Sequence, residues 1–240
     1  MKLRCSLLLF IALLAFAVPA AAQDEALLSF TGYDYQTDPG APNGVYLALG
    51  DSYYAVGFVT SFHPTWLEPY VDTSLNEYTF YQHDLVVDSY SFGGGVLVVT
   101  FAPGGVVDYY EDSSKDAQNP PNPPNCPAYG SGPPNLDSPT KFSNGTLAIS
   151  GSLVNASLYY DYNFDQGGFQ SEMNITFDGY GYVPVGSYNG WFMSGLVSPP
   201  PGGNPCPAPA GYDHQLSGEC RHPVVSNSHG TWGALKKLYR

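Results

Sequence analysis

Apolar and polar residues alternate along most of this chain, and a period of two is the pattern of β-strands with one buried face. In the stretch between Phe169 and Phe177, both ends together with Met173 and Ile175 point one way, while polar side chains point the other. Further strands are predicted at 27–35, 45–49, 54–62, 77–82, 85–91, 96–101, 105–110, 145–151, 153–163 and 190–197.

Gly and Pro residues mark the turns between these strands. Ala102–Gly105 is predicted to form one hairpin turn, and Asp165–Gly168 another. Many short strands separated by turn signals are typical of a sandwich or a barrel, and no βαβ spacing is present. We therefore expect an all-β fold, a mainly antiparallel β-sandwich of about ten short strands.

Two stretches interrupt this rhythm. Residues 113–140 and 198–211 are rich in Pro, Asn, Ser and Gly, and we expect them to be long surface loops. The last ten residues, 231–240, place Trp232, Leu235 and Leu238 on one helical face and predict a short amphipathic C-terminal helix.

The N-terminus has the pattern of a secretory signal peptide. Lys2 and Arg4 precede an apolar run, 7–18, and small residues up to Ala22 form a cleavage pattern before Gln23. We expect residues 1–22 to be removed and the protein to be secreted, either to the periplasm or outside the cell. Residues 23–230 then form a single β-domain, and 231–240 a tail.

The charge balance is strongly acidic and narrows the range of partners. The net charge of −13 becomes −15 once Lys2 and Arg4 leave with the signal segment. Nucleic acids and anionic membrane surfaces gain nothing from meeting more negative charge. No other run approaches the ~20 apolar residues that a membrane span needs, so we expect no membrane insertion. Cations, or neutral ligands such as glycans, remain as partners.

Three cysteines follow the signal segment, which is an odd number for an oxidising compartment. The short loop between Cys206 and Cys220 favours a disulfide between them. Cys126 and Cys206 share the sequence Cys-Pro-Ala, so a bridge between those two stays open as an alternative.

Part of the chain resembles a group of exported proteins. The run 105–112, Asp116 and the run 142–151 resemble a recurring pattern in uncharacterised exported bacterial β-sandwich proteins, many of which carry C-terminal sorting signals of the PEP-CTERM kind. The segment Thr231–Arg240 is similar to the ends of other exported bacterial chains. The resemblance implies a secreted β-sandwich and implies no particular activity.

Two clusters of acidic residues are candidate cation-binding sites. Asp161, Asn163 and Asp165 alternate and are followed by Glu172, which approximates the spacing of an EF-hand calcium loop. The sixth position is Gln166 where that loop needs Gly, so we expect a strand and turn with at most weak calcium binding, and no other cofactor. A second cluster, Asp108, Glu111, Asp112 and Asp116, is expected to be a solvated acidic turn at a strand end.

The sequence also allows a second functional hypothesis, that of an esterase. Gly50-Asp51-Ser52 resembles the nucleophile block of SGNH-type esterases, and Glu219 with His222 loosely resembles their acid–histidine block. The strand predicted directly after Ser52 disagrees with the helix those enzymes have there. We therefore expect no enzymatic activity and no catalytic residues.

The chain is rich in tyrosine, and aromatic faces can stack on sugar rings. Trp66, Tyr188 and Trp191 are the candidate ligand-binding residues. The expected function is a secreted, non-enzymatic binding or surface-associated structural domain, with a carbohydrate-binding module as its more specific form.

Overall fold

The computed structural model of the chain describes residues 25–36, 47–64, 67–117, 140–179, 181, 183, 188–198 and 212–222. The chain divides into two compact units, one of them the two terminal segments and the other Ala26–His222. The second unit contains all of the β-fold described below except Glu25, the first residue of β1. Its elements are β1 (Glu25–Gln36), β2 (Ser52–Phe62), the 3₁₀ turn η1 (Glu68–Tyr70), β3 (Glu77–Gly93), β4 (Val96–Phe101), β5 (Val106–Asp112), the single helical turn α3 (Thr140–Ser143), β6 (Thr146–Asp161), β7 (Gln166–Asp178), β8 (Trp191–Ser198) and β9 (His214–His222).

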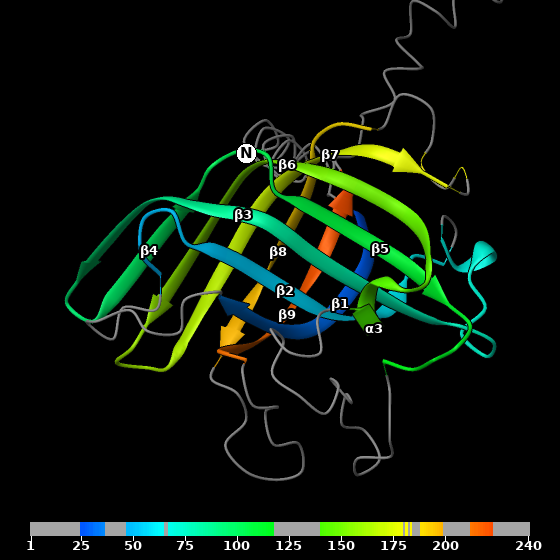
Figure 1. Cartoon of the computed structure of the whole chain (residues 1–240), viewed down its shortest axis with the longest axis horizontal. Helices are drawn as coiled ribbons and strands as arrows, with labels where there is room; N and C mark the ends of the chain where they lie inside the picture. The colour runs from blue at the N-terminus through cyan, green and yellow to red at the C-terminus, as the bar shows by residue number, and fades with distance from the viewer. Residues whose placement is uncertain are drawn as a thin grey trace, which may run out of the picture. The chain divides into compact units, whose positions relative to one another are not determined.

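The strands form a closed antiparallel β-barrel (Figure 1). Neighbouring strands follow the order β2-β1-β9-β8-β7-β6-β4-β3, and β3 pairs in turn with β2, which closes a ring of eight. The ninth strand, β5, lies between β3 and β6, as β4 does, but it pairs with a different part of each of these two long strands. Closure removes the exposed strand edges at which sheets otherwise aggregate.

The predicted β-sandwich is therefore wrong, although the all-β class is confirmed. Alternation of apolar and polar residues fixes which side chains share a face, and it is the same for a sandwich and a barrel. What decides between them is the pairing of β9 with β1, far apart in the sequence. The backbone N–H of Asp213 donates to the carbonyl of Asp34 at 2.9 Å, and Thr31 Oγ1 donates to the carbonyl of Leu216 at 3.3 Å.

Several predicted strands merge or continue into one another. The predicted strands 77–82 and 85–91 are one strand, β3, which bends at Asp84, a residue in the left-handed region at φ 56°. Likewise 145–151 and 153–163 form the single strand β6, with register shifts near Gly151 and Val154. The structure contains no strand at the described residues of 45–49, and it adds β9, which the sequence pattern did not predict.

The two predicted hairpin turns have different outcomes. Ala102–Gly105 is not a hairpin turn, because β4 and β5 both run antiparallel to β3 and so continue in the same direction. The β6–β7 hairpin is confirmed, but its turn lies at residues 162–165 and Gln166–Gly168 belong to β7.

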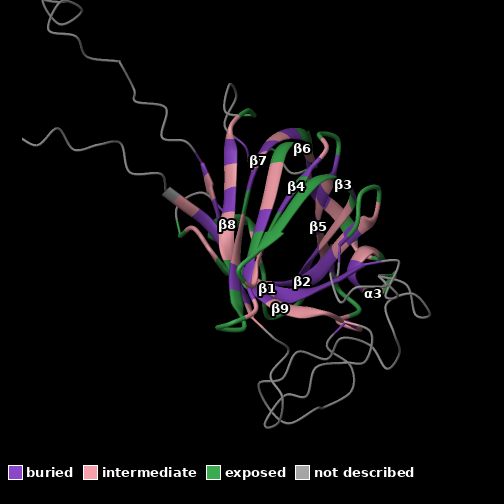
Figure 2. Ribbon diagram, turned by 90° about the vertical axis from the view of Figure 1, so that its left-hand side faces the viewer, coloured by how far each residue is buried: buried purple, intermediate pink, exposed green. Residues whose placement is uncertain are grey.

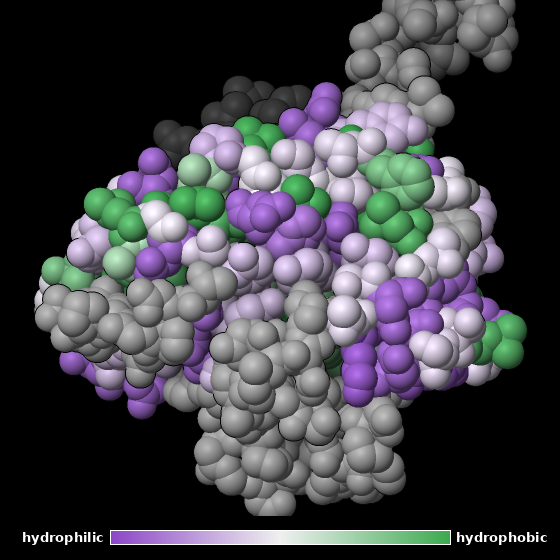
Figure 3. All heavy atoms as spheres, in the orientation of Figure 1, coloured by the Kyte–Doolittle hydropathy of each residue, from purple (hydrophilic) through white to green (hydrophobic). Residues whose placement is uncertain are grey.

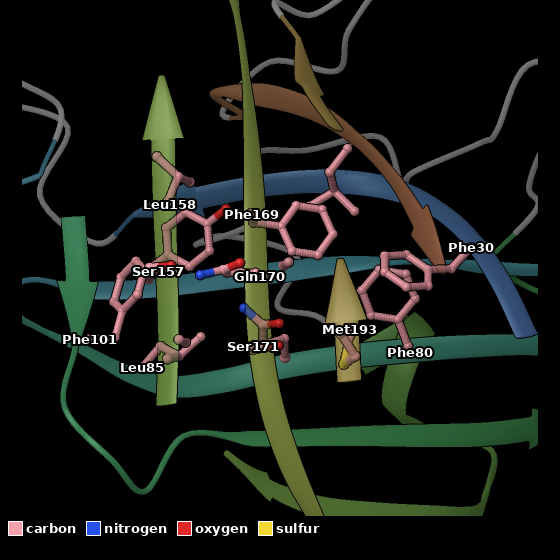
Figure 4. Close-up of a pocket in the computed structure, with 15 residues that line it drawn as sticks. Phe30, Phe80, Leu85, Phe101, Ser157, Leu158, Phe169, Gln170, Ser171 and Met193 are labelled. Carbon is pink, nitrogen blue, oxygen red and sulfur yellow. The ribbon is translucent and has the colours of Figure 1, made fainter. Parts of the chain in front are cut away.

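The interior of the barrel is filled by side chains. Phe30 and Phe80 pack edge to face with ring centroids 5.1 Å apart, and Phe169 lies 6.0 Å from Phe30 (Figure 4). Paired glycines make room for these rings: a Cβ on Gly57 would lie 2.6 Å from Phe80 Cε1. Two cavities lined by described interior residues have volumes of about 20 and 30 Å³, roughly the space of one water each. Neither of these two cavities is large enough for a ligand of drug size.

A second apolar layer lies on the outside of β1, β2 and β3. Tyr33, Tyr35, Val56 and Phe58 point outward yet are buried, and Phe142 of α3 packs against them. Figure 2 shows runs of consecutive buried residues in β1 and β2, whereas buried and more exposed residues alternate along β7 and β8. Many of the tyrosines thus belong to the fold itself.

Candidate functional site

An open groove of about 360 Å³ lies on the outer face of β4, β6 and β7. Val98, Tyr159 and Gly168 are register partners across these strands, so they form one outward row, which Leu196 of β8 continues. Gly168 has no side chain and leaves a gap between Tyr159 and Leu196. Tyr159, whose ring borders the groove, is 45% exposed, and Leu196, at the end of this row, is 69% exposed.

The polar lining of this groove is neutral. Ser157 and Gln170 are register partners in the adjacent row and contribute a hydroxyl and an amide. None of the described residues that line the groove is charged, in a chain whose net charge is −13. Figure 3 shows apolar residues on the left of the molecule, where β3 and β4 lie (Figure 1). The described lining therefore offers stacking and neutral hydrogen bonds. The Tyr159 hydroxyl donates to the Asp161 carboxylate at 3.4 Å, so a negative charge lies beside the groove.

A cluster of polar side chains closes one end of the barrel, and we call it the polar mouth. Asp34, Gln36, Tyr53, Asp213 and His214 make up this cluster. Asp34 is fully buried and accepts hydrogen bonds from the Tyr53 hydroxyl at 2.7 Å and from the backbone N–H of His214 at 2.7 Å. His214 Nδ1 lies 3.2 Å from both carboxylate oxygens of Asp34. The buried carboxylate is thus held by three donors.

Burial and neighbouring charges shift the pKa values in the polar mouth. Burial, with the nearby Asp34 carboxylate, raises the pKa of Asp213 to about 6, against opposing effects of His214 and the Gln36 backbone N–H. Burial acts to lower the pKa of His214, but the charge and hydrogen bond of Asp34 outweigh it, so that pKa is raised. Asp213 therefore changes charge near pH 6, and the pKa of His214 lies above its ordinary value; shifted pKa values are common at functional sites.

A second carboxylate–histidine cluster lies on the outside of the barrel. His83 Nδ1 is 2.8 Å from Asp84 and its Nε2 is 3.2 Å from Asp108, which also accepts from the Tyr110 hydroxyl at 3.1 Å. The ring stacks on Tyr81 with centroids 4.6 Å apart. The hydrogen bond to Asp108 raises the pKa of His83, burial opposes this, and Asp84 adds to it. Two carboxylates on the two ring nitrogens favour the doubly protonated imidazolium.

The predicted calcium set does not assemble. Asp161, the last residue of β6, accepts at Oδ1 a hydrogen bond from the backbone N–H of Asn163 at 2.9 Å, and Asn163 and Asp165 lie in the β6–β7 turn. Glu172 pairs instead with Asn155, whose Nδ2 donates to it at 3.0 Å. Asn155 lies six positions before Asp161 on β6, which is about 20 Å along a strand. The turn and Glu172 therefore cannot share an ion.

The second predicted acidic cluster is also divided. Asp108 belongs to the His83 cluster, while Glu111 accepts from the Tyr78 hydroxyl at 3.1 Å. Asp112 and Asp116 do lie together, and Glu77, which the sequence did not point to, joins them with ligand atoms within 4.8 Å of one another. Asp112 accepts from Ser114, and Asn144 donates to Asp116. Three oxygen ligands are fewer than the six to eight that calcium takes, so we assign no metal to this group.

Two of the three predicted ligand-binding aromatics, Trp191 and Tyr188, are described by the structure, and they do not share an exposed surface. Trp191 is buried inside the barrel at 2% exposure, with its ring 5.8 Å from that of His222, so its assignment as a ligand contact is wrong. Tyr188 is 37% exposed, at the end of β8 opposite the groove. Trp66 lies outside the described residues. The aromatic residue that does border a groove, Tyr159, was predicted to be part of a strand and not singled out.

The predicted disulfide between Cys206 and Cys220 is wrong, because Cys220 is a free, fully buried cysteine inside the barrel. Burial raises the pKa of its thiol to about 12, and the hydrogen bond with Tyr109 opposes this. Cys206 and Cys126, the alternative pair, lie outside the described residues.

The fold places the two predicted esterase residues, Ser52 and His222, far apart. Ser52 begins β2, as a strand and not before a helix, and the next residue, Tyr53, is the register partner of Gln36. His222 ends β9 at the opposite end of β1, since β9 runs antiparallel to β1 with His214 beside Asp34. The two side chains are about 30 Å apart by strand rise, which excludes proton transfer between them.

No protein-family model, curated protein or solved structure matches the chain. Among the residues that the structure describes, no helix has the length and apolar character needed to cross a bilayer.

Proposed function

We propose that this chain is an exported, non-enzymatic binding domain that binds a neutral, hydroxyl-rich ligand, a glycan chain, in the outer groove of β4, β6 and β7. The observation that carries the proposal is the groove itself: an exposed tyrosine ring beside a glycine gap, with a hydroxyl and an amide in the next row. An exposed aromatic face stacks on the apolar face of a sugar ring, and neutral side chains hydrogen-bond its hydroxyl groups.

The surroundings favour a neutral ligand over a charged one. The described lining of the groove offers no cation for an anionic ligand, and the net charge of −13 repels one. The two cavities described above inside the barrel are water-sized, which supports an outer site. A groove open to solvent also suits a chain that extends past the contact on both sides.

A glycan-array screen of the purified chain, followed by calorimetry on the best ligand, tests the proposal. Tyr159→Ala removes the stacking surface and is expected to weaken binding at least tenfold, while melting temperature stays within about 2 °C because the ring is half exposed. Tyr188→Ala removes another exposed tyrosine away from the groove and serves as the matched control.

Three results would count against the proposal. They are the absence of any glycan ligand on the array, equal affinity of the Tyr159→Ala variant and the unmodified chain, and equal weakening by Tyr188→Ala. The last would move the binding surface to the opposite end of β8.

A further inference from the structure

The outer groove is the centre of a longer uncharged surface on five neighbouring strands. β8, β7, β6, β4 and β3 follow one another in the barrel wall (Figure 2). Their register places one outward polar residue from each strand in a continuous row: Ser89, Thr100, Ser157, Gln170 and Ser194. The hydroxyl oxygens of Ser89 and Thr100 lie 2.6 Å apart, as expected for side chains on the same face. The row thus presents a hydroxyl or an amide on every strand.

A second outward row lies beside the first, two residues away on each strand. It is the row of Tyr159, and its members on the same five strands are Ser91, Val98, Tyr159, Gly168 and Leu196. Three of these side chains are apolar or aromatic, and all three are exposed. We call the two rows together the neutral band, because none of their residues carries a charge.

Charged residues border the neutral band. Along the strands it ends at Asp161 on β6 and at Glu172 on β7. Across the strands it ends at Glu219 of β9, the register partner of Ser194, and at Asp88, which bulges out beside the β3 end. The band is therefore only two rows wide, with about 7 Å between the rows, but about 19 Å long from β3 to β8.

This shape indicates how a glycan chain would lie. A chain along β6 or β7 would meet a carboxylate just beyond the second row. A chain across the strands keeps the hydroxyl and amide row on one side and Val98, Tyr159 and Leu196 on the other. A pyranose ring has the same division, because its hydroxyl groups lie around the edge and its C–H groups form an apolar face. The spacing between strands, about 4.8 Å, is also close to the length of one pyranose unit.

We propose that the neutral band binds an internal stretch of a linear, uncharged polysaccharide that runs across the strands, with about one sugar unit on each strand from β3 to β8. The proposal rests on the proposed function, since the sugar stacked on Tyr159 is the centre of this stretch. It makes Ser194 an outer contact that determines how much of the chain is bound. The carboxylates of Asp161 and Glu172 at the borders disfavour polysaccharides that carry carboxylate or sulfate groups.

Calorimetry with a series of oligosaccharides tests the length of the site. The series uses two to eight units of the linear chain that the glycan array selects. We expect affinity to rise up to about five units, one for each strand, and to change little beyond, because further units pass the ends of the band. A five-unit chain of the same linkage built from uronic acids should bind at least tenfold more weakly.

Ser194→Ala tests the direction of the chain. Loss of one neutral hydrogen bond should weaken binding of the five-unit chain about two- to tenfold. Binding of the two-unit chain should not change, because it needs only the centre of the band around Tyr159. Ser198→Ala is the matched control: Ser198 lies four residues further along the same face of β8, beyond the band, and its loss should affect neither chain.

The failure of this proposal can be told apart from the failure of the glycan function. If no glycan binds, both are wrong. If two-unit and five-unit chains bind equally tightly, the glycan function stands and the extended site is overturned. If Ser198→Ala weakens binding of the five-unit chain and Ser194→Ala does not, the chain does not run across the strands in the neutral band.

Discussion

The two ends of the barrel are built from the same strands but differ in chemistry. At the polar mouth, the interior positions at the end of β1 and the start of β9 carry Asp34, Gln36 and His214. At the opposite end, β8 and β9 place Trp191 and Cys220 in the interior, and both are buried without charge.

The packed end is held by close contact between large and polarizable side chains. The Tyr109 hydroxyl donates to Met193 Sδ at 3.7 Å and interacts with Cys220. Burial, with the nearby Cys220, raises the pKa of Tyr109 well above its ordinary value, so the ring stays neutral at all ordinary pH values. Neither Tyr109 nor Cys220 changes charge at ordinary pH, so their contribution to stability should not depend on pH, whereas that of the polar mouth should.

Trp191→Ala gives the largest effect that this comparison predicts. The indole is 2% exposed, and its removal leaves a cavity that the closed barrel cannot collapse around. We expect a loss of about 3–5 kcal/mol in the free energy of unfolding, measured by urea denaturation. Tyr188→Ala, at an exposed position three residues before, should change it by less than about 0.5 kcal/mol. Similar losses in the two variants would mean that this end is not tightly packed.

Asp34→Asn tests the polar mouth and should have the next largest effect. The substitution keeps the shape but removes the charge that Tyr53 and His214 face. We expect a loss of about 2–3 kcal/mol near pH 6, the usual range for hydrogen bonds to a charged group. The pKa of His214, followed by nuclear magnetic resonance, should fall. A variant of unchanged stability would show that Asp34 contributes nothing as an anion.

The pH dependence of stability should come from the polar mouth, through Asp213 and His214. The pKa of Asp213 is about 6 in the folded chain against an ordinary value of 3.8, so between these values the folded chain holds a proton that the unfolded chain has released. Stability from this group therefore falls as pH rises from about 4 to 6. The raised pKa of His214 has the same sign: its contribution is present below the ordinary value of 6.5 and is lost as pH rises through the folded value.

We expect the two groups together to lower the free energy of unfolding by about 1–2 kcal/mol between pH 4.5 and pH 8, after allowing for the solvent that still reaches Asp213. Thermal melting across this range measures the change. Asp213→Asn should flatten the profile between pH 4.5 and 6. A profile that rises with pH in both proteins would contradict the sign.

The sequence predicted the strands better than their arrangement. Alternation located β1, β2, β4 and β8 within a few residues, because a half-buried strand needs that pattern wherever it lies. It missed β9, where Gly218 and Glu219 interrupt the alternation. Closure depends on the pairing of β9 with β1 over a long sequence separation, which no local pattern encodes.

Candidate sites were predicted less well, for a related reason. Asp161 and Glu172 have calcium-loop spacing in the sequence, but strand register places them far apart. Glu77 and Asp112 were never grouped, although they are direct register partners on β3 and β5. Sequence spacing measures proximity only within a turn or a helix, whereas in a barrel the register decides which side chains meet.

Of these substitutions, His83→Gln should change the free energy of unfolding least. His83, like His214, lies beside carboxylates, but it is on the outside of the barrel, so the substitution tests what burial contributes. The His83 ring is flanked by Asp84 and Asp108, with Tyr81 and Tyr110 beside it, yet the side chains of His83 and Asp84 are 22% and 69% exposed. Solvent screens such a pair, so we expect a loss of about 0.5–1 kcal/mol at pH 6. The raised pKa of His83 means that this contribution is present below pH 6.5 and disappears as pH rises through the folded value. Urea denaturation at pH 6 and at pH 9 should therefore give a difference between the variant and the unmodified chain only at the lower pH. His83→Gln and Asp34→Asn could instead lower the free energy of unfolding by the same amount. Burial would then not make the histidine–carboxylate cluster of the polar mouth more stabilising than the exposed one.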